Sequence, residues 1–163
     1  MSGEKEFDGS VGMVLRRVAT VSSPVKEPKP AMRGVTAELV VDGDLDGILE
    51  GIEDFSHLLV LCWAHLISPE RKSITRVHPM GREDLPLLGI FSTHSPARPN
   101  PILATVVRLV ERKGNVLKVE GLDAIDGTPV IDIKPFTRGT CPDGEIREPE
   151  WLTEAVRQSR QKA

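Results

Sequence analysis

Apolar and polar residues alternate along several short segments of the chain, as in β-strands that bury one face. In residues 35–41, for example, Val, Ala and Leu occupy every second position, with Thr and Glu between them. Gly, Pro and Asp residues separate these segments and indicate turns. By this reasoning we expect strands at residues 11–20, 35–41, 73–78, 88–92, 102–110, 116–122 and 130–133.

Three other segments have different patterns. Residues 57–66 are almost continuously apolar, which predicts a strand buried on both faces. Residues 48–55 place Ile48, Ile52 and Phe55 at nearly helical spacing. Residues 22–34 contain three prolines and alternating lysines, so we expect an extended, exposed connection there.

The order of these elements predicts a mainly β fold. Many short strands without interleaved helices favour a closed or nearly closed β-barrel over a doubly wound sheet. After Pro149, apolar residues recur with helical period, which predicts a short C-terminal amphipathic helix. We therefore expect a single domain over residues 1–163, with the barrel at about 11–136 and the tail and helix at 137–163.

Composition narrows the function classes. The chain has 163 residues, 39% hydrophobic and 28% charged, as in an ordinary soluble domain. It has neither a hydrophobic leader nor an apolar run long enough for a membrane span, so we expect a cytoplasmic protein without a membrane partner. Cys62 and Cys141 are too isolated to indicate a disulfide framework or a zinc knuckle. His57 and His65 would lie roughly 26 Å apart on one extended strand, so we expect no metal site.

The net charge of −3 argues mildly against a dedicated nucleic-acid binder. Two segments are nevertheless basic, whereas acidic residues concentrate between positions 42 and 54. A nucleic-acid-binding patch and an unevenly charged solvated surface both remain open. The basic residues are Arg16, Arg17, Lys26, Lys29 and Arg33 in the first segment, and Arg71, Lys72, Arg76 and Arg82 in the second.

Two polar segments are candidates for chemistry. Residues 89–102 form a loop stiffened by three prolines, which suits either ligand recognition or a rigid turn. Its polar side chains are Thr93, His94, Ser95, Arg98 and Asn100.

Residues 121–136 form the second segment. Asp126-Gly127 indicates a turn, and the period of two places Asp132 and Lys134 on one strand face. With Asp123 these groups form either a polar site or turn residues beside a solvated ion pair. A G-x-S-x-G elbow, a Walker loop and a G-x-G-x-x-G fingerprint are all absent from the sequence.

Three motifs carry a family resemblance: GIEDFSHLLVL, GIFSTHSPARPNPI and GLDAIDGTPVIDIKPF. In this order they resemble the TsaA-like (TrmO) family of S-adenosylmethionine-dependent tRNA methyltransferases, over about Val11 to Phe136. The resemblance implies a single-sheeted β-barrel and a homodimer that binds S-adenosylmethionine near its interface. It also implies tRNA as substrate, with methylation at N6 of threonylcarbamoyladenosine next to the anticodon.

The resemblance also implies site residues. The cofactor contacts would be Pro30, Ala31, Met32, His65, Leu66, Thr93, His94, Ser95, Leu103, Ala104, Leu122, Asp123, Ala124 and Ile125. As a hypothesis beyond the resemblance, Arg98 would bind a phosphate or the threonyl carboxylate of the substrate, and Asn100 would also bind substrate. As a hypothesis, Asp126 or Asp132, held by Lys134, would help remove the substrate proton as catalytic residues.

The chain also departs from the family pattern. His94 stands where Arg is usual, Leu103 where Gly is usual and Phe136 where Tyr is usual, and the chain ends soon after the barrel, without the C-terminal extension of many bacterial members. Two alternatives therefore remain open: a methyltransferase acting on another RNA or a small molecule, and a non-catalytic S-adenosylmethionine-binding module.

Overall fold

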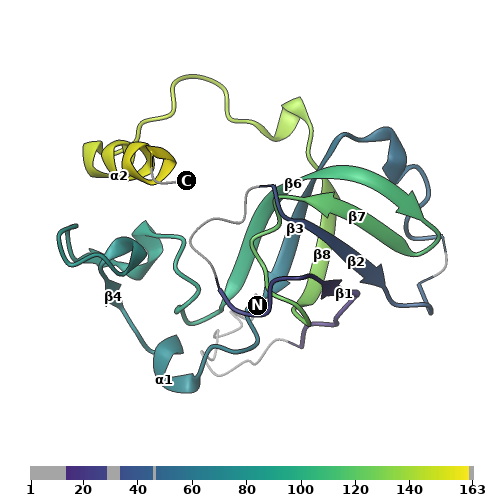
Figure 1. The fold of residues 1–163 in the computed structure, drawn as a ribbon, viewed down its shortest axis with the longest axis horizontal. Helices are drawn as coiled ribbons and strands as arrows, with labels where there is room; N and C mark the ends of the chain where they lie inside the picture. Colours follow the sequence, from purple (N-terminus) through teal and green to yellow (C-terminus); the bar gives the residue numbers. More distant parts are fainter. Residues whose placement is uncertain (1–13, 29–33, 46, 162–163) are drawn as a thin grey trace, which may run out of the picture.

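The fold was obtained as a computed structural model, which describes residues 14–28, 34–45 and 47–161. Six antiparallel strands form a closed barrel in the order β1-β2-β7-β6-β3-β8 (Figure 1). They are β1 Ala19–Ser22, β2 Thr36–Val41, β3 His57–Trp63, β6 Ile102–Lys113, β7 Val116–Glu120 and β8 Pro129–Pro135. This confirms the mainly β prediction and the barrel.

Side chains alternate across the barrel wall. Leu58, Val60 and Cys62 on β3 point into the core, while Leu59 and Leu61 between them are half-buried on the outside. The prediction that this strand is buried on both faces and runs to Leu66 is therefore wrong, because a closed sheet has only one interior face. β3 ends at Trp63.

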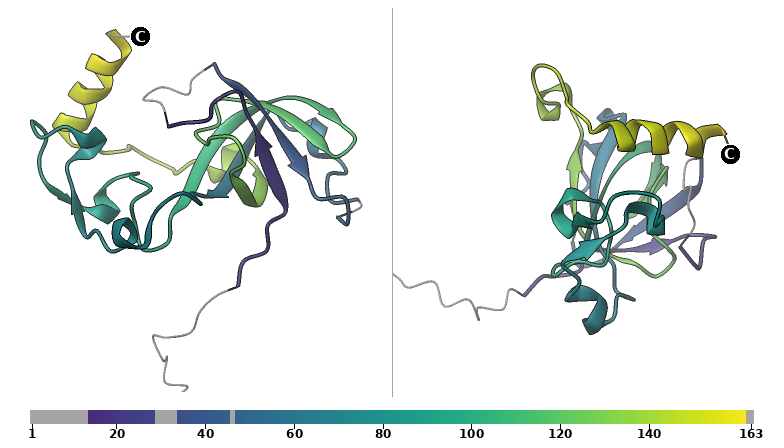
Figure 2. Two further views of the ribbon diagram at one scale, coloured as in Figure 1. Left: turned by 60° about the horizontal axis from the view of Figure 1, so that its bottom comes forward. Right: turned by 90° about the vertical axis from the view of Figure 1, so that its left-hand side faces the viewer.

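A lobe lies beside the barrel between β3 and β6 (Figures 1 and 2). It contains α1 Pro69–Lys72 and a two-stranded sheet of β4 Arg76–Val77 and β5 Leu88–Gly89, with the 3-10 turns η2 Pro79–Gly81 and η3 Ile90–Ser92. The strands predicted at 73–78 and 88–92 are only two residues long in the structure. They pair with one another, and neither joins the barrel.

The C-terminal helix predicted after Pro149 is confirmed as α2 Glu150–Gln161. It follows the 3-10 turn η4 Arg138–Thr140 and lies beside the lobe, away from the barrel strands (Figures 1 and 2). Arg82 of the lobe donates from Nη1 to Oε1 of Gln158 at 3.0 Å, so a polar contact joins lobe and helix. The helices in the described part of the chain are all too short or too polar to cross a membrane.

Three local predictions need correction. The first strand covers Ala19–Ser22 and not 11–20; residues 14–18 are not in a strand, and 11–13 lie outside the described residues. The near-helical spacing at 48–55 gives turns and only the short 3-10 turn η1 Ile52–Asp54. The connection that follows Ser22 is not fully exposed, because Ser23 and Val25 are buried.

We expect Leu58→Ala to lower the free energy of unfolding by about 2–5 kcal/mol, because Leu58 is fully buried in the barrel core. The neighbouring Leu59→Ala is a matched control on the outer face and should cost no more than about 1–2 kcal/mol. Denaturant unfolding of both variants measures the difference. Equal losses would contradict the assignment of the two barrel faces.

Candidate functional site

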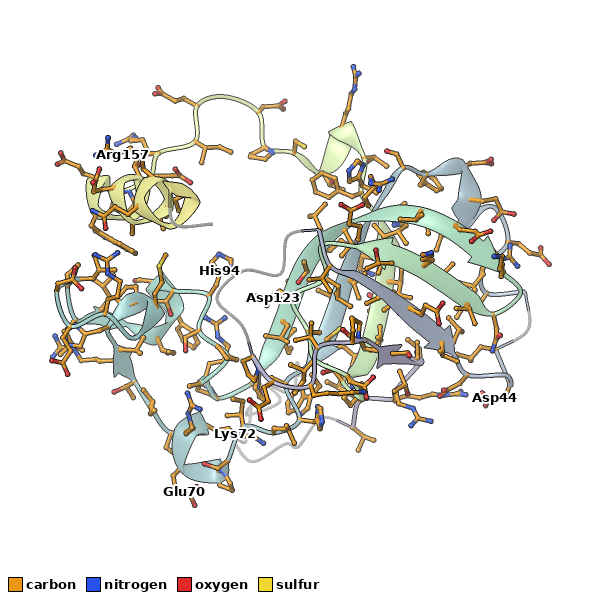
Figure 3. The ribbon with its side chains drawn as sticks, viewed as in Figure 1. Asp44, Glu70, Lys72, His94, Asp123 and Arg157 are labelled. Atoms are coloured by element: carbon orange, nitrogen blue, oxygen red, sulfur yellow. The ribbon has the colours of Figure 1, made fainter. Side chains whose placement is uncertain are left out.

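Loops from the barrel and the lobe supply the predicted site residues. His65 and Leu66 follow β3, the loop at 93–95 follows η3, and residues 122–125 connect β7 to β8. In Figure 3, His94 and Asp123 both lie between the barrel and the lobe. Pro30, Ala31 and Met32 lie outside the described residues.

Residues 122–125 of the β7–β8 connection include one carboxylate, that of Asp123. Leu122 and Ala124 are buried in the barrel core, at 1% and 5% exposed, so neither residue is open to a ligand. Asp123 lies between them and is exposed, yet burial of its carboxyl raises its pKa above the usual Asp value. In the part of the chain that the structure describes, Asp123 has neither a hydrogen bond nor an ion pair. It is therefore a partly desolvated acceptor without a donor.

The predicted contacts on the other loops are mostly exposed. His65 and His94 are exposed, and Leu66 is 70% exposed at the end of the segment that leaves β3. Leu103 packs against the barrel core, whereas Ala104 faces outward from β6. Thr93 and Ser95 are half-buried and Asn100 is exposed.

Asp126 binds a neighbouring turn. Its Oδ1 accepts from the Ser23 main-chain N–H at 2.9 Å and its Oδ2 from Lys26 Nζ at 2.6 Å, while its own N–H donates to the Val25 carbonyl at 2.8 Å. The Lys26 hydrogen bond, followed by the Ser23 hydrogen bond, holds the pKa of Asp126 below its usual range. The turn predicted at Asp126-Gly127 is confirmed, and Gly127 has φ of 74°. These long-range contacts explain why Ser23 and Val25 are buried.

Asp132 and Lys134 share a face of β8, as predicted, and form an ion pair at 2.6 Å. Asp132 Oδ1 also accepts from the Ile133 main-chain N–H at 2.9 Å. The pair is partly exposed, on the strand that follows the Asp123 loop.

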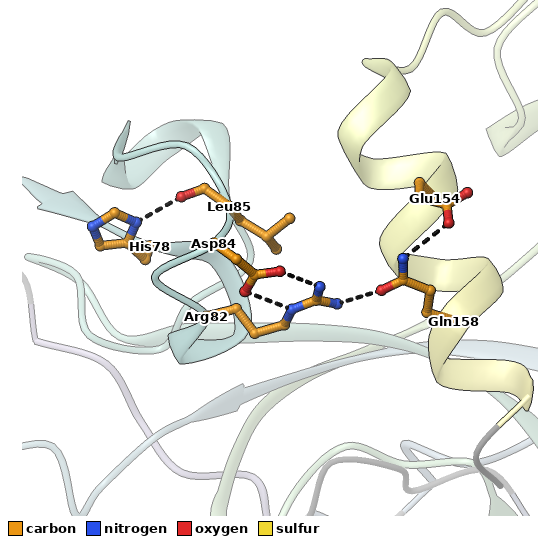
Figure 4. A network of polar contacts seen from close by, with 6 residues as sticks. All are labelled: His78, Arg82, Asp84, Leu85, Glu154 and Gln158. Atoms are coloured by element: carbon orange, nitrogen blue, oxygen red, sulfur yellow. Dashed lines mark hydrogen bonds and ion pairs between the residues drawn. The ribbon is translucent and has the colours of Figure 1, made fainter.

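The two basic segments differ in their partners. Arg16, Arg17 and Lys26 of the first form ion pairs with Asp44, Asp42 and Asp126, whereas Lys29 and Arg33 lie outside the described residues. In the second, Arg82 pairs with Asp84, and Figure 4 follows this contact through Gln158 to Glu154 of α2. Lys72 Nζ lies 5.6 Å from the Trp63 ring centroid.

Arg71 and Arg76 are exposed and make no ion pair with any residue in the described ranges. They lie at α1 and β4, close in sequence to His65 and Leu66. Local sequence identified the charge of both segments, but the neutralisation of the first depends on acids distant along the chain.

Metal ligation and thiol chemistry receive no support from the described residues. They contain no group of three or more His, Cys, Asp or Glu side chains placed to hold a metal ion. Burial raises the pKa of the Cys62 thiol to about 12, so this side chain remains a neutral core group.

A closed antiparallel barrel with a lobe inserted between β3 and β6 defines the class of fold. Residues 22–140 match the tRNA-methyltransferase O N-terminal domain, and the chain belongs to this family. Its structure is similar to the crystal structure of TrmO from P. aeruginosa, with a TM-score of 0.68 and 25% identity, covering 90% of this chain and 64% of that one.

Two archaeal relatives extend the comparison. A probable S-adenosyl-L-methionine-binding protein of Pyrococcus abyssi is 38% identical over 139 residues, which is 82% of this chain and 71% of the relative. An S-adenosyl-L-methionine-binding protein of Archaeoglobus fulgidus is 40% identical over 131 residues, covering 77% of this chain and 90% of the relative.

We expect Asp126→Ala to lower the unfolding midpoint more than Lys26→Met, because Lys26→Met removes only an exposed ion pair and leaves the Ser23 contact intact. Asp126→Asn keeps an acceptor for Ser23 and should fall between them. Because the pKa of Asp126 is lower in the folded protein than in the unfolded chain, its ionised carboxylate stabilises the fold at pH values above the unfolded-state pKa. This stabilisation is lost as the pH falls through the folded-state pKa of Asp126. Denaturant midpoints of the wild type and the variants at neutral and acidic pH measure this pH dependence. If Asp126→Asn lowers the midpoint equally at both pH values, the stabilising role of the ionised carboxylate is contradicted.

Proposed function

We propose that this chain binds S-adenosylmethionine and transfers a methyl group to tRNA, at N6 of threonylcarbamoyladenosine next to the anticodon. The observation that carries the cofactor assignment is the Asp123 carboxyl, which is desolvated without a partner in the described residues. Membership of the tRNA-methyltransferase O family and the names of the archaeal relatives support it.

The loop residues fit the chemistry of this cofactor. An ammonium or hydroxyl group finds an acceptor in Asp123, the exposed residue of the segment 122–125. Exposed Leu66 offers an apolar surface for a purine, and exposed His94 offers a ring nitrogen to a carboxylate. Bound there, S-adenosylmethionine supplies an electrophilic methyl carbon, and the protein positions the acceptor nitrogen in line with it.

The acceptor nitrogen must also lose a proton. Of the two carboxylates considered for this role, Asp126 already holds the turn after β1, because it accepts from the Ser23 main-chain N–H and from Lys26 Nζ. We therefore assign the role to Asp132, which Lys134 holds in place at 2.6 Å.

Arg71 and Arg76 support tRNA as the partner. Cations already paired with carboxylates gain little from a phosphate, whereas these two are exposed and have no acidic partner in the described residues. Lys72 lies between them in the chain, beside Trp63. A basic segment is compatible with the net charge of −3, because acidic residues concentrate elsewhere in the chain, between positions 42 and 54.

A homodimer is also part of the proposal. The outer face of β6 exposes Ile102, Val106 and Val110 at 37–43%, and Val106 lies opposite half-buried Leu59 of β3. A second copy covering this apolar strip would remove it from water. A monomeric sedimentation mass at micromolar concentration would contradict this part of the proposal.

Calorimetric titration with S-adenosylmethionine tests the cofactor assignment. We expect one site per chain, with Asp123→Asn binding about 10–100-fold more weakly, because a hydrogen bond to a charged group is lost. The same variant should melt at an equal or higher temperature, since it removes a desolvated charge. Wild-type affinity should fall as pH decreases through the raised pKa of Asp123, and the Asn variant should lose this dependence.

Two results of this titration would contradict the proposal. If the folded wild-type protein does not bind S-adenosylmethionine, the proposed function is wrong. If Asp123→Asn binds as tightly as the wild type, Asp123 is not the acceptor.

Single-turnover methyl transfer to tRNA containing threonylcarbamoyladenosine tests the substrate. We expect Asp132→Asn to lower the rate about 10²-fold or more with unchanged cofactor affinity. Replacing Arg71 and Arg76 together by Gln should weaken tRNA binding and reduce the slope of log affinity against log salt by about 2. Arg16→Gln is the matched control, because Arg16 already pairs with Asp44. Cofactor binding without transfer to any tRNA pool would favour the non-catalytic alternative.

A further inference from the structure

Arg98 is the centre of the loop that carries His94. Its Nε donates to the Ser95 carbonyl at 2.9 Å, and its Nη2 donates to the Ile90 carbonyl at 3.2 Å and to the Thr93 carbonyl. All three acceptors are main-chain atoms within eight residues of Arg98. The guanidinium therefore binds the backbone of its own loop.

The other contacts of the loop depend on the same geometry. Thr93 Oγ1 donates to the Ile90 carbonyl at 2.9 Å and accepts from the Ser95 N–H at 3.3 Å. Ser95 Oγ accepts from the Ala97 N–H at 3.3 Å. Ile90 and Ala97 are 5% and 2% exposed, so both ends of the loop are anchored in the protein. Exposed His94 lies between Thr93 and Ser95, two of the three residues whose carbonyls Arg98 holds.

The charge of Arg98 is not matched by an acid. In the described ranges no carboxylate lies within ion-pair distance of its guanidinium, and its partners are neutral carbonyl dipoles. A permanent positive charge therefore lies under the His94 loop. An anionic group bound at this loop would be stabilised by that charge without touching it.

We propose that Arg98 is a positioning residue that sets the conformation of the Ile90–Ala97 loop and thereby places His94 at the cofactor site. This replaces the prediction that Arg98 binds a substrate phosphate or carboxylate directly. The inference rests on the proposed function only where it concerns the cofactor, because the loop contacts are independent of any ligand.

Lysine does not replace arginine in this role. An ammonium is a point charge on a flexible stem, whereas the planar guanidinium presents donors in fixed directions. Arg98→Lys thus keeps the charge and loses the geometry, which separates positioning from simple charge attraction.

The test compares Arg98→Lys with the wild type in two independent measurements. We expect the main-chain N–H groups of Ser95 and Ala97 to exchange with solvent at least about tenfold faster in the variant, because their acceptors are no longer held. S-adenosylmethionine should bind at least about tenfold more weakly by calorimetry. In Arg98→Ala, added methylguanidinium should restore part of the affinity and methylammonium should not.

Arg112→Lys is the matched control. Arg112 also donates to main-chain carbonyls, those of Leu49 at 2.9 Å and Gly114 at 3.1 Å, but in loops at 47–51 and 114–115 that contribute no residue to the candidate site. It should lower stability and leave cofactor affinity unchanged. Equal loss of affinity in both variants would mean that Arg98 acts only through general stability, which would overturn the proposal.

Two further outcomes are distinguishable. If Arg98→Lys keeps its amide protection and cofactor affinity, while Arg98→Ala weakens tRNA binding and lowers its salt slope by about 1, Arg98 is a phosphate ligand and the proposal is wrong. If the wild-type protein binds no S-adenosylmethionine, the proposed function fails. The exchange measurement then still decides whether Arg98 holds the loop.

Discussion

Closure of the barrel depends on a short seam between its first and last strands. β1 and β8 pair through only Ala19 with Val130 and Thr20 with Pro129. Main-chain bonds extend the seam, from Val18 to Val130 at 2.9 Å and from Gly127 to Val21 at 2.8 Å. Asp126 continues it by holding the turn after β1. Because the core lies inside the closed sheet, each interior side chain depends on this seam for its burial.

The alternation of apolar residues was sufficient to predict the strands that form most of the barrel wall. It failed at β1, where the buried turn at Ser23 and Val25 is stabilised by Asp126, about a hundred residues later in the chain. Local sequence does not encode such a contact. The candidate site was likewise only partly predictable from local sequence. The motifs located Asp123, His94 and Arg98. Only the folded chain shows that Arg98 faces backbone carbonyls and that Asp123 has no donor in the described residues.

Charged groups on this protein have three different roles. Pairs such as Arg16 with Asp44 neutralise one another on the surface and contribute little to stability. Asp126 and Arg98 hold main-chain groups and so define loop shapes. Asp123, Arg71 and Arg76 are among the groups that lack a charged partner in the described residues, so a ligand can supply one. Net charge alone does not distinguish these roles.

The chain leaves the barrel to form the lobe, and returns to the barrel, at neighbouring positions. β3 ends at Trp63 and β6 begins at Ile102, and these two residues are Cα partners in the sheet. The lobe is thus an insertion between two paired strands, and the barrel closes whatever its length or sequence. Insertions, deletions and substitutions in the lobe can accumulate without breaking a barrel hydrogen bond. Different members of the family can therefore diverge in what they recognise while keeping the same barrel.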